Sequence, residues 1–401
     1  MQNAENLSKA DVIKKICSTN VKESNLFLRK LYSELSKYDK LAWNYFGVRE
    51  KQKICLGICN LGEVWIDYKV KGLIDSIYVF TNNDISKESV QKAVDEAFIN
   101  HLKKEKYTAI ANFHTKDISF KNMCKKNIEI KSEEKNGKFI TSITFSFEAF
   151  SGVDAEYIHT QKLNYLKHLL FAYTNIKFEN IENYIINDNE LKYEEKDWVE
   201  FDRDWIDYYF DEHIGPQNTV LLYDFFDIFR IVLDNDTYNK EMRLVLNAAQ
   251  ELYCGKLMID NILTNGEYNI PGYVDITNTI ILSVLEPLSN IRAEKPEHCP
   301  SCGNLVYKIR KKVEVLCNTY LNDWLTKYIS DIKYGQRSTF LHEGNALTNE
   351  FYSGRCIPLI NPSKPNTLLP PTTTINFNMI NYVSYIFRHV VRDILDKIDL
   401  Q

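Results

Sequence analysis

Four segments of the first 150 positions are rich in β-branched and aromatic side chains, and hydrophobic and polar residues alternate along several of them. The segments cover residues 63–70, 76–81, 107–114 and 139–147. A period of two in such residues predicts β-strands. Helices are expected beside them, with Asp11 and Ser24 as candidate caps of amphipathic runs and with a further helix over residues 86–104. The first 150 residues therefore predict a domain that mixes helices and strands.

The hydrophobic spacing in the rest of the chain is mainly three and four residues, which is the period of an α-helix. Helices are predicted over residues 154–175, 217–234, 238–263, 275–291, 303–330, 332–343 and 376–398. The sequence thus predicts an α+β fold class: an N-terminal mixed α/β-strand domain (1–150), a helical and acidic-aromatic connecting region (151–235) and an all-α helical bundle (236–401).

The charge balance narrows the classes of function. The 401 residues include 49 basic and 54 acidic side chains, so the formal net charge is −5. A protein coated with positive charge is therefore excluded, and any nucleic-acid site must be local. Hydrophobic residues make up 44% and charged residues 26% of the chain, which excludes wholesale disorder and a membrane protein. No leader pattern and no run near the roughly 18 apolar residues of a membrane span is present, so we expect a cytoplasmic protein.

The segment 188–212 has an unusual composition, with eleven acidic residues, three basic residues and seven aromatic residues. One interpretation is a solvated linker helix with an aromatic face, because charge runs usually face water. The other interpretation is a segment that docks onto a basic surface of the same molecule and masks it. The sequence does not separate the two.

A metal-binding pattern occurs once, at Cys299-Pro-Ser-Cys302-Gly303. Two thiolates at this spacing can converge on one ion, which is half of a tetrahedral zinc site. Candidates for the other half are His298, Cys254, Cys317, Cys356 or the same turn of a second subunit. We expect either a structural zinc ion, with no metal needed for catalysis, or a tight turn of reduced thiols. A zinc-dependent hydrolase is a third hypothesis.

Basic residues gather between Gly303 and Arg337, where seven basic and three acidic side chains give a local net charge of +4. This is the kind of local patch that can bind a nucleic acid. Lys312, Lys333 and Tyr334 are the candidate substrate contacts within it. The tyrosine could stack on a base or fill the core.

Arg337 is followed five positions later by His342, on a helix that comes after a long amphipathic one. A guanidinium and an imidazole can act together on a phosphate group. The alternative is a structural helix end, in which the histidine interacts with the last carbonyls and Gly344 is the residue after the cap.

The string 334–344, the Cys-Pro-Ser-Cys-Gly turn, the loop 354–358 and the closing helix together resemble an Apea-like HEPN domain. The resemblance covers residues 237–399 and is densest over 299–345. It implies a dimeric helical bundle and a metal-independent endoribonuclease with an R-x4-6-H motif. It also implies an abortive-infection toxin with a role in antiviral defence, acting on cellular RNA such as tRNA and responding to a phage-derived trigger.

The resemblance assigns the catalytic arginine to Arg337, the polar residue after it to Ser338 and the histidine to His342. Family members often have a further polar or acidic helper on an earlier helix, and Glu286 is the candidate that the sequence offers. A non-catalytic HEPN scaffold that binds RNA or a partner protein is the alternative function.

The residue types suit RNA cleavage without a metal. Imidazole, with an ordinary pKa of about 6.5, can take the proton of a 2′-hydroxyl or protonate the departing 5′-oxygen. A guanidinium can offer two donors to the negative charge that gathers on the phosphorane. Positions five apart diverge by roughly 140° around a helix, so we expect a homodimer that pools Arg337 and His342 of both subunits in one cleft.

Overall fold

A computed structural model describes most of the elements that the sequence predicts. The described residues are 11–15, 20–38, 53–69, 73–81, 83–99, 103–115, 119–120, 122–125, 128–174, 178–186, 219–220, 232, 240–265, 273–291, 297–298, 300–306, 308–343 and 379–399. They form helices and small sheets, so the α+β class is confirmed.

The first sheet has four antiparallel strands in the order β1-β4-β3-β2. Its elements are β1 (Asp11–Lys15), β2 (Lys53–Cys59), β3 (Gly62–Lys69) and β4 (Leu73–Phe80), with helices α1 (Val21–Leu35) and α2 (Asp84–Phe98). A two-residue turn joins β2 to β3 because Cys59 pairs directly with Gly62. Gly62 has φ +121°, and a Cβ there would collide with the carbonyl oxygen of Phe80, so only glycine fits.

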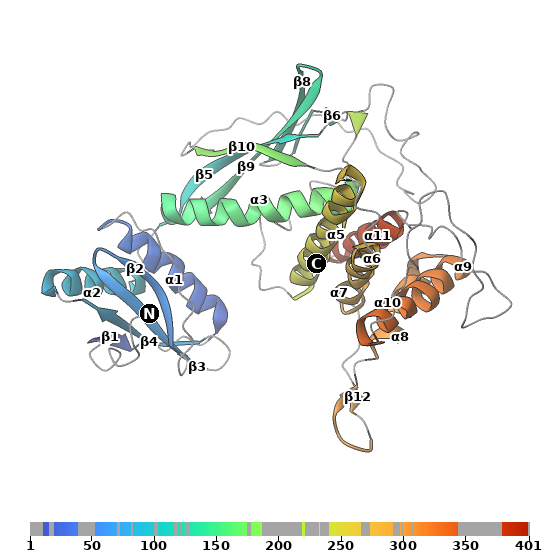
Figure 1. Ribbon diagram of the computed structural model, residues 1–401. Coiled ribbons are helices and arrows are strands. Elements are labelled where there is room, and N and C mark those ends of the chain that lie inside the picture. Colours follow the sequence, from blue (N-terminus) through green and yellow to red (C-terminus); the bar gives the residue numbers. More distant parts are fainter. Residues whose placement is uncertain are drawn as a thin grey trace. The chain divides into compact units, whose positions relative to one another are not determined.

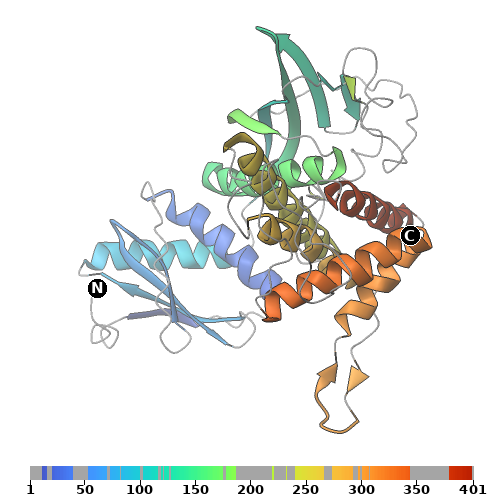
Figure 2. The same cartoon turned by 45° about the vertical axis from the view of Figure 1, so that its right-hand side comes forward.

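Both helices cover one face of this sheet (Figures 1 and 2). Leu31 and Leu35 of α1 and Val90 and Val94 of α2 are fully buried, and they share one core cluster with Ile77 of β4. Burial alternates along β4 except at Ser76 and Ile77, which are both buried next to a register shift against β3, so that Ile74, Ile77 and Val79 all belong to this core. The expected helix-and-strand character of the first segment is thereby confirmed for the residues that the structure describes.

The predicted caps at Asp11 and Ser24 are wrong. Asp11 begins edge strand β1, which pairs with β4. The helix starts at Val21, where the Asn20 side chain accepts a hydrogen bond from the backbone N–H of Glu23 at 2.9 Å. Asparagine at this position satisfies one of the free N–H groups of the first turn.

The second sheet has five strands in the order β10-β5-β9-β8-β7. Its strands are β5 (Glu105–His114), β7 (Met123–Lys125), β8 (Ile128–Lys135), β9 (Lys138–Ala149) and β10 (Glu179–Ile186); a separate parallel pair joins β6 (Ser119–Phe120) to β11 (Thr219–Val220). The predicted strands 107–114 and 139–147 are confirmed as parts of β5 and β9. Strand β8 was not predicted, because its exposed half, 131–135, is mostly charged and has the composition of a loop.

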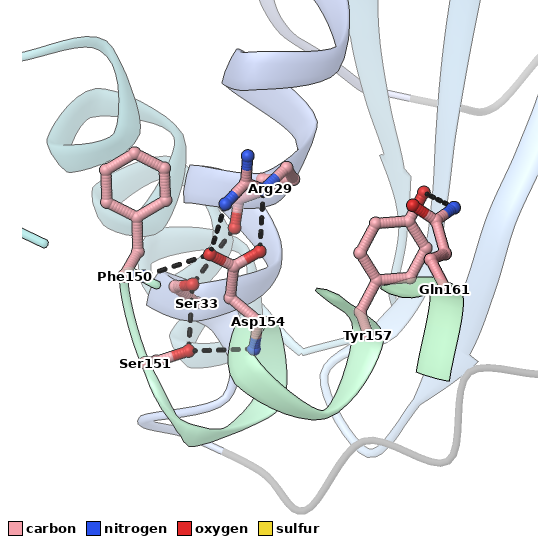
Figure 3. A network of polar contacts seen from close by, with 7 residues as sticks. All are labelled: Arg29, Ser33, Phe150, Ser151, Asp154, Tyr157 and Gln161. Atoms are coloured by element: carbon pink, nitrogen blue, oxygen red, sulfur yellow. Dashed lines mark hydrogen bonds and ion pairs between the residues drawn. The ribbon is translucent and has the colours of Figure 1, made fainter. Parts of the chain in front are cut away.

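Helix α3 (Gly152–Thr174) begins at a polar network drawn in Figure 3. Asp154, whose side chain is 1% exposed, pairs with Arg29 of α1 through two bonds of 2.8 and 2.9 Å. It also accepts a bond from the backbone N–H of Phe150, while its own N–H donates to Ser151. Ser151 in turn donates to Ser33 of α1. The start of α3 is therefore fixed to α1 by charge-assisted hydrogen bonds.

The remaining helices build an all-α part. They are α5 (Lys240–Asn265), α6 (Tyr273–Ser283), α7 (Leu285–Ser289), α8 (Ile309–Tyr320), α9 (Asp323–Thr326), the π-helix η3 (Lys327–Lys333), α10 (Tyr334–Glu343) and α11 (Met379–Asp399). Helix α5 packs against α6, α7 and α11, and α10 packs against α6. Side chains such as Leu252, Leu285, Val313 and Phe387 are fully buried among them.

The predicted helix over 303–330 is wrong in extent. Its first residues belong to a hairpin of β12 (Glu297–His298) and β13 (Leu305–Val306), which Figure 1 shows as a narrow projection. The chain also turns extended at Leu321, and Asn322 caps a new helix by accepting a bond from Leu325.

The predicted helix over 275–291 is interrupted between Ser283 and Leu285. A continuous helix would need the backbone N–H of residue 287 to donate to the carbonyl of Ser283. Residue 287 is proline, which has no such donor, so the interruption follows from the sequence. Most of the predicted helix over 217–234 lies outside the described residues. Within it the structure describes only strand β11 (219–220) and residue 232.

The chain divides into two compact units that interleave along the sequence. One contains residues 1–110, 144–161 and 184–192; the other contains 111–143, 162–183 and 193–401. The boundaries expected near 150 and 235 remain predictions. Within the described part of the chain, no helix is both long enough and apolar enough to cross a lipid bilayer.

We predict that Asp154→Ala lowers the free energy of unfolding by about 3 to 5 kcal/mol, because it leaves Arg29 without its buried counter-charge. Urea unfolding followed by circular dichroism measures this change. The matched control is Glu133→Ala, which removes an exposed ion pair with Lys135 and should cost less than about 0.5 kcal/mol. Equal losses in the two variants would contradict the prediction.

Candidate functional site

Helix α10 carries the arginine and the histidine that the sequence singled out, and it continues directly from η3. Among its ten residues only Tyr334 is buried, with 4% exposure. The tyrosine hydroxyl donates to Oε1 of Glu286 on α7 at 2.7 Å. Burial and this bond raise the pKa of the hydroxyl. Polar contacts therefore contribute to the position of this helix.

Arg337 supplies the central contact of this site. Its Nη1 lies 2.6 Å from Oε1 of Glu286, and its Nη2 donates to Oγ of Ser283 at 2.9 Å. The guanidinium also lies over the ring of Tyr334 at 5.3 Å. The arginine side chain is 14% exposed and that of Glu286 is 26% exposed. The guanidinium is thus fixed where α6, α7 and α10 meet.

A second carboxylate, Glu251 on α5, belongs to the same cluster. Its Oε2 is buried and has no hydrogen-bond partner, and the same holds for Nε of Arg337. Burial raises the pKa of Glu251, the negative charge of Glu286 raises it further, and Arg337 lowers it. The guanidinium is therefore paired with one carboxylate and lies near a second in a partly desolvated place.

His342 lies in the last turn of α10 and is exposed to solvent, whereas Ser338 is half-buried. Five residues along an α-helix correspond to a rotation of roughly 140° and a rise of about 7.5 Å. The arginine therefore faces the polar cluster while the histidine faces outward from another side of the helix. Within one chain the two groups do not form a single compact pair.

The three residues predicted to contact the substrate each interact with other residues of the protein. Lys312 donates to the Asn290 side chain at 3.0 Å. Lys333 lies 5.3 Å over the ring of Tyr328, and burial lowers its pKa. The ring of Tyr334 is in the core, which is the second of the two roles that the sequence left open. The residues Lys308, Arg310, Lys311 and Lys327 of the same basic region are exposed.

Residues 300–303 of the Cys-Pro-Ser-Cys-Gly string lie in the turn between β12 and β13. Gly303 has φ +71°, in the region that favours glycine, and Cys302 is an exposed free thiol. Cys299 lies outside the described residues. Among the residues that are described, no group of three or more possible metal ligands occurs. Zinc binding by Cys299 and Cys302 therefore remains a prediction.

The candidates for the second half of a zinc site differ in their surroundings. Cys254 on α5 is exposed, whereas Cys317 is buried in α8, where desolvation raises its pKa to about 12. Zinc binding by Cys317 would have to displace this proton. Cys356 lies outside the described residues, as do Gly344, the loop 354–358 and the acidic segment 188–212.

The sequence did not predict that Glu251 and Ser283 belong to the site. Glu251 lies three residues after Ala248 and directly before Leu252 on α5, and both of these residues are fully buried. A carboxylate at such an apolar position is a signal for a buried ionic partner. Ser283 carried no signal, because a serine near a helix end is common.

No family model matches the chain, no curated protein matches its sequence and no solved structure matches its fold. The function must therefore be argued from the residues of the site.

We predict that Glu286→Ala lowers the free energy of unfolding by about 3 kcal/mol, because it leaves the guanidinium of Arg337 partly buried without its counter-charge. The control is Asp331→Ala, which removes an ion pair with Arg310 at 3.4 Å between two exposed side chains. That pair should be worth no more than about 1 kcal/mol. A smaller loss for Glu286→Ala than for Asp331→Ala, by urea unfolding, would refute the assigned role.

We also predict a pH signature for Glu251. A carboxyl group whose pKa is raised by folding does not change the free energy of unfolding at a pH below its unfolded pKa. It lowers the free energy of unfolding as pH rises through its folded pKa. Glu251→Gln should therefore gain stability relative to the wild type as pH rises from about 4 to 8. Urea unfolding at a series of pH values measures this difference. Parallel stability curves for the two proteins would contradict it.

Proposed function

We propose that the protein is a metal-independent endoribonuclease of the HEPN type, with Arg337 and His342 as its catalytic residues. The observation that carries the proposal is the arrangement on α10. A guanidinium is held by Glu286 and Ser283, and an exposed imidazole follows five residues later on the same helix. The contact of Arg337 with Glu286 on the earlier helix α7 supports Glu286 as the acidic helper.

The chemistry is an attack of a ribose 2′-oxygen on the neighbouring phosphorus. The new bond from the 2′-oxygen to phosphorus forms as the bond from phosphorus to the 5′-oxygen breaks. His342 accepts the proton of the 2′-hydroxyl or supplies a proton to the departing oxygen, and solvent water takes part in the other proton transfer. Arg337 balances the charge that gathers on the non-bridging oxygens, and Ser338 orients the phosphate.

A homodimer would complete this site. Because the two groups diverge around α10, a second copy related by a two-fold axis can bring its own imidazole toward the guanidinium of the first. The exposed cations of α8 would line the approach of the RNA.

The biological role is proposed from the resemblance to Apea-like proteins. We propose a cytoplasmic abortive-infection effector that cleaves cellular RNA such as tRNA after a phage-derived trigger.

A second candidate function is a non-catalytic scaffold that binds RNA or a partner protein. The observation that favours it is the occupancy of Arg337: Glu286 and Ser283 take two of its donor groups and the side chain is 14% exposed. Such an arginine can stabilise a bundle without touching a substrate.

We predict that His342→Ala lowers RNA cleavage by at least about 100-fold and leaves folding unchanged, since the side chain is exposed. The assay is cleavage of total RNA by the purified protein in the presence of EDTA. Leu341→Ala is the matched control, because this neighbour is also exposed on α10 and has no proton to transfer. Arg337→Lys is the second test variant, since it keeps the charge and loses the two-donor geometry.

Equal activity of wild type and His342→Ala would refute the proposal. Absence of cleavage by the wild type, with retained binding of RNA, would favour the scaffold instead. Circular dichroism of every variant separates loss of chemistry from loss of fold.

A further inference from the structure

An exposed aromatic pair lies on the helical run that leads into α10. Trp324 of α9 is 69% exposed, and its ring is stacked on that of Tyr328 at a centroid distance of 5.6 Å and an interplanar angle of 1°. This is an offset parallel stack, in which Tyr328 supports one face of the indole. Most of the indole remains open to solvent.

The surrounding fold holds the indole in this position. Asn322 caps the start of α9, and Leu325 and Ile329 anchor the opposite side of the run in the core. Tryptophan is highly buried on average, and among the described large hydrophobic side chains only Ile85 is more exposed. Burial in the core does not explain an indole that is presented outward in this way.

The charges around the stack are mainly positive. Lys333 lies 5.3 Å from the centre of the Tyr328 ring, and Lys327, three residues after the tryptophan, is exposed. The nearby acidic groups are Asp323, which is exposed, and Asp331, which is paired with Arg310. From Lys308 to Lys333 the sequence has six basic and three acidic residues, a net charge of +3.

We propose that Trp324, supported by Tyr328, is a stacking platform for an unpaired base of single-stranded RNA, with Lys327 and Lys333 near its phosphates. Single-stranded nucleic acids are bound by aromatic rings that stack on bases within a positively charged surface. Such stacking tolerates any base. The platform would therefore prefer unpaired over paired RNA and would have no preference for a particular base sequence. The inference rests on the proposed function for the identity of the ligand and adds the substrate class.

The test is the binding of short homopolymeric single-stranded RNA to the full chain, measured by fluorescence anisotropy in a His342→Ala background that prevents cleavage. Trp324→Ala should raise the Kd by about 5- to 100-fold, the usual effect of removing one base–aromatic stack. Trp324→Phe should change it by less than about threefold, because a smaller ring still stacks. RNA should also quench the fluorescence of the parent protein, and this quenching should be reduced in Trp324→Phe.

The matched control is Tyr157→Ala, an aromatic residue of the other compact unit that is 52% exposed; its Kd should equal that of the parent protein. Equal Kd values for Trp324→Ala and the parent would overturn the platform, as would an equal loss of affinity for duplex RNA. Conversion of a dimer to a monomer by Trp324→Ala, measured by light scattering, would also overturn it, because the indole would then contact a second copy. Trp324-dependent binding without any cleavage by the wild type would refute the nuclease and leave the platform standing.

Discussion

The ion pair between Arg337 and Glu286 is the contact on which the candidate site depends. Helix α10 has one fully buried side chain among its ten residues, so polar contacts contribute to its position beside apolar packing. The pair, together with the bonds to Ser283 and Tyr334, connects α10 to α6 and α7. Because both charges are largely removed from water, the loss of one partner leaves the other uncompensated. The position of the outward-facing His342 follows from this inner contact.

The same contact sets a condition on catalysis. A phosphate that approaches Arg337 must compete with Glu286 or share the guanidinium with it, and Glu251 adds a second carboxyl group to the cluster. Phosphate oxygens and a carboxylate accept from the same fork of donors.

The Trp324–Tyr328 stack lies toward the other end of the continuous helical run from α9 to α10. Trp324 and His342 are 18 residues apart along this run, which includes the π-helix η3, so an RNA bound at both places would span several helical turns.

Sequence periodicity predicted the long elements well. Helices α3, α5 and α11 and strands β5 and β9 appear near their expected places, because each has a sustained pattern of one period. The hairpin at 297–306 and the break at Leu321 were not predicted, since both depend on single backbone conformations that periodicity does not encode. Of the candidate site, the sequence predicted the residues along α10 and, through the resemblance, Glu286 on α7, and it missed the other contacts across helices. The contact of Arg337 with Ser283 and the nearness of Glu251 depend on how α5, α6 and α10 pack, which a single sequence does not state.

The chemical identity of the RNA ends tests the central claim most directly. Purified wild-type protein is incubated with RNA in EDTA, and the new termini are determined by end-specific ligation and mass spectrometry. Attack by the 2′-oxygen predicts a 2′,3′-cyclic phosphate on one fragment and a 5′-hydroxyl on the other. Fragments with a 5′-phosphate and a 3′-hydroxyl, or an absence of cleavage under conditions in which the protein is folded and dimeric, would contradict the account.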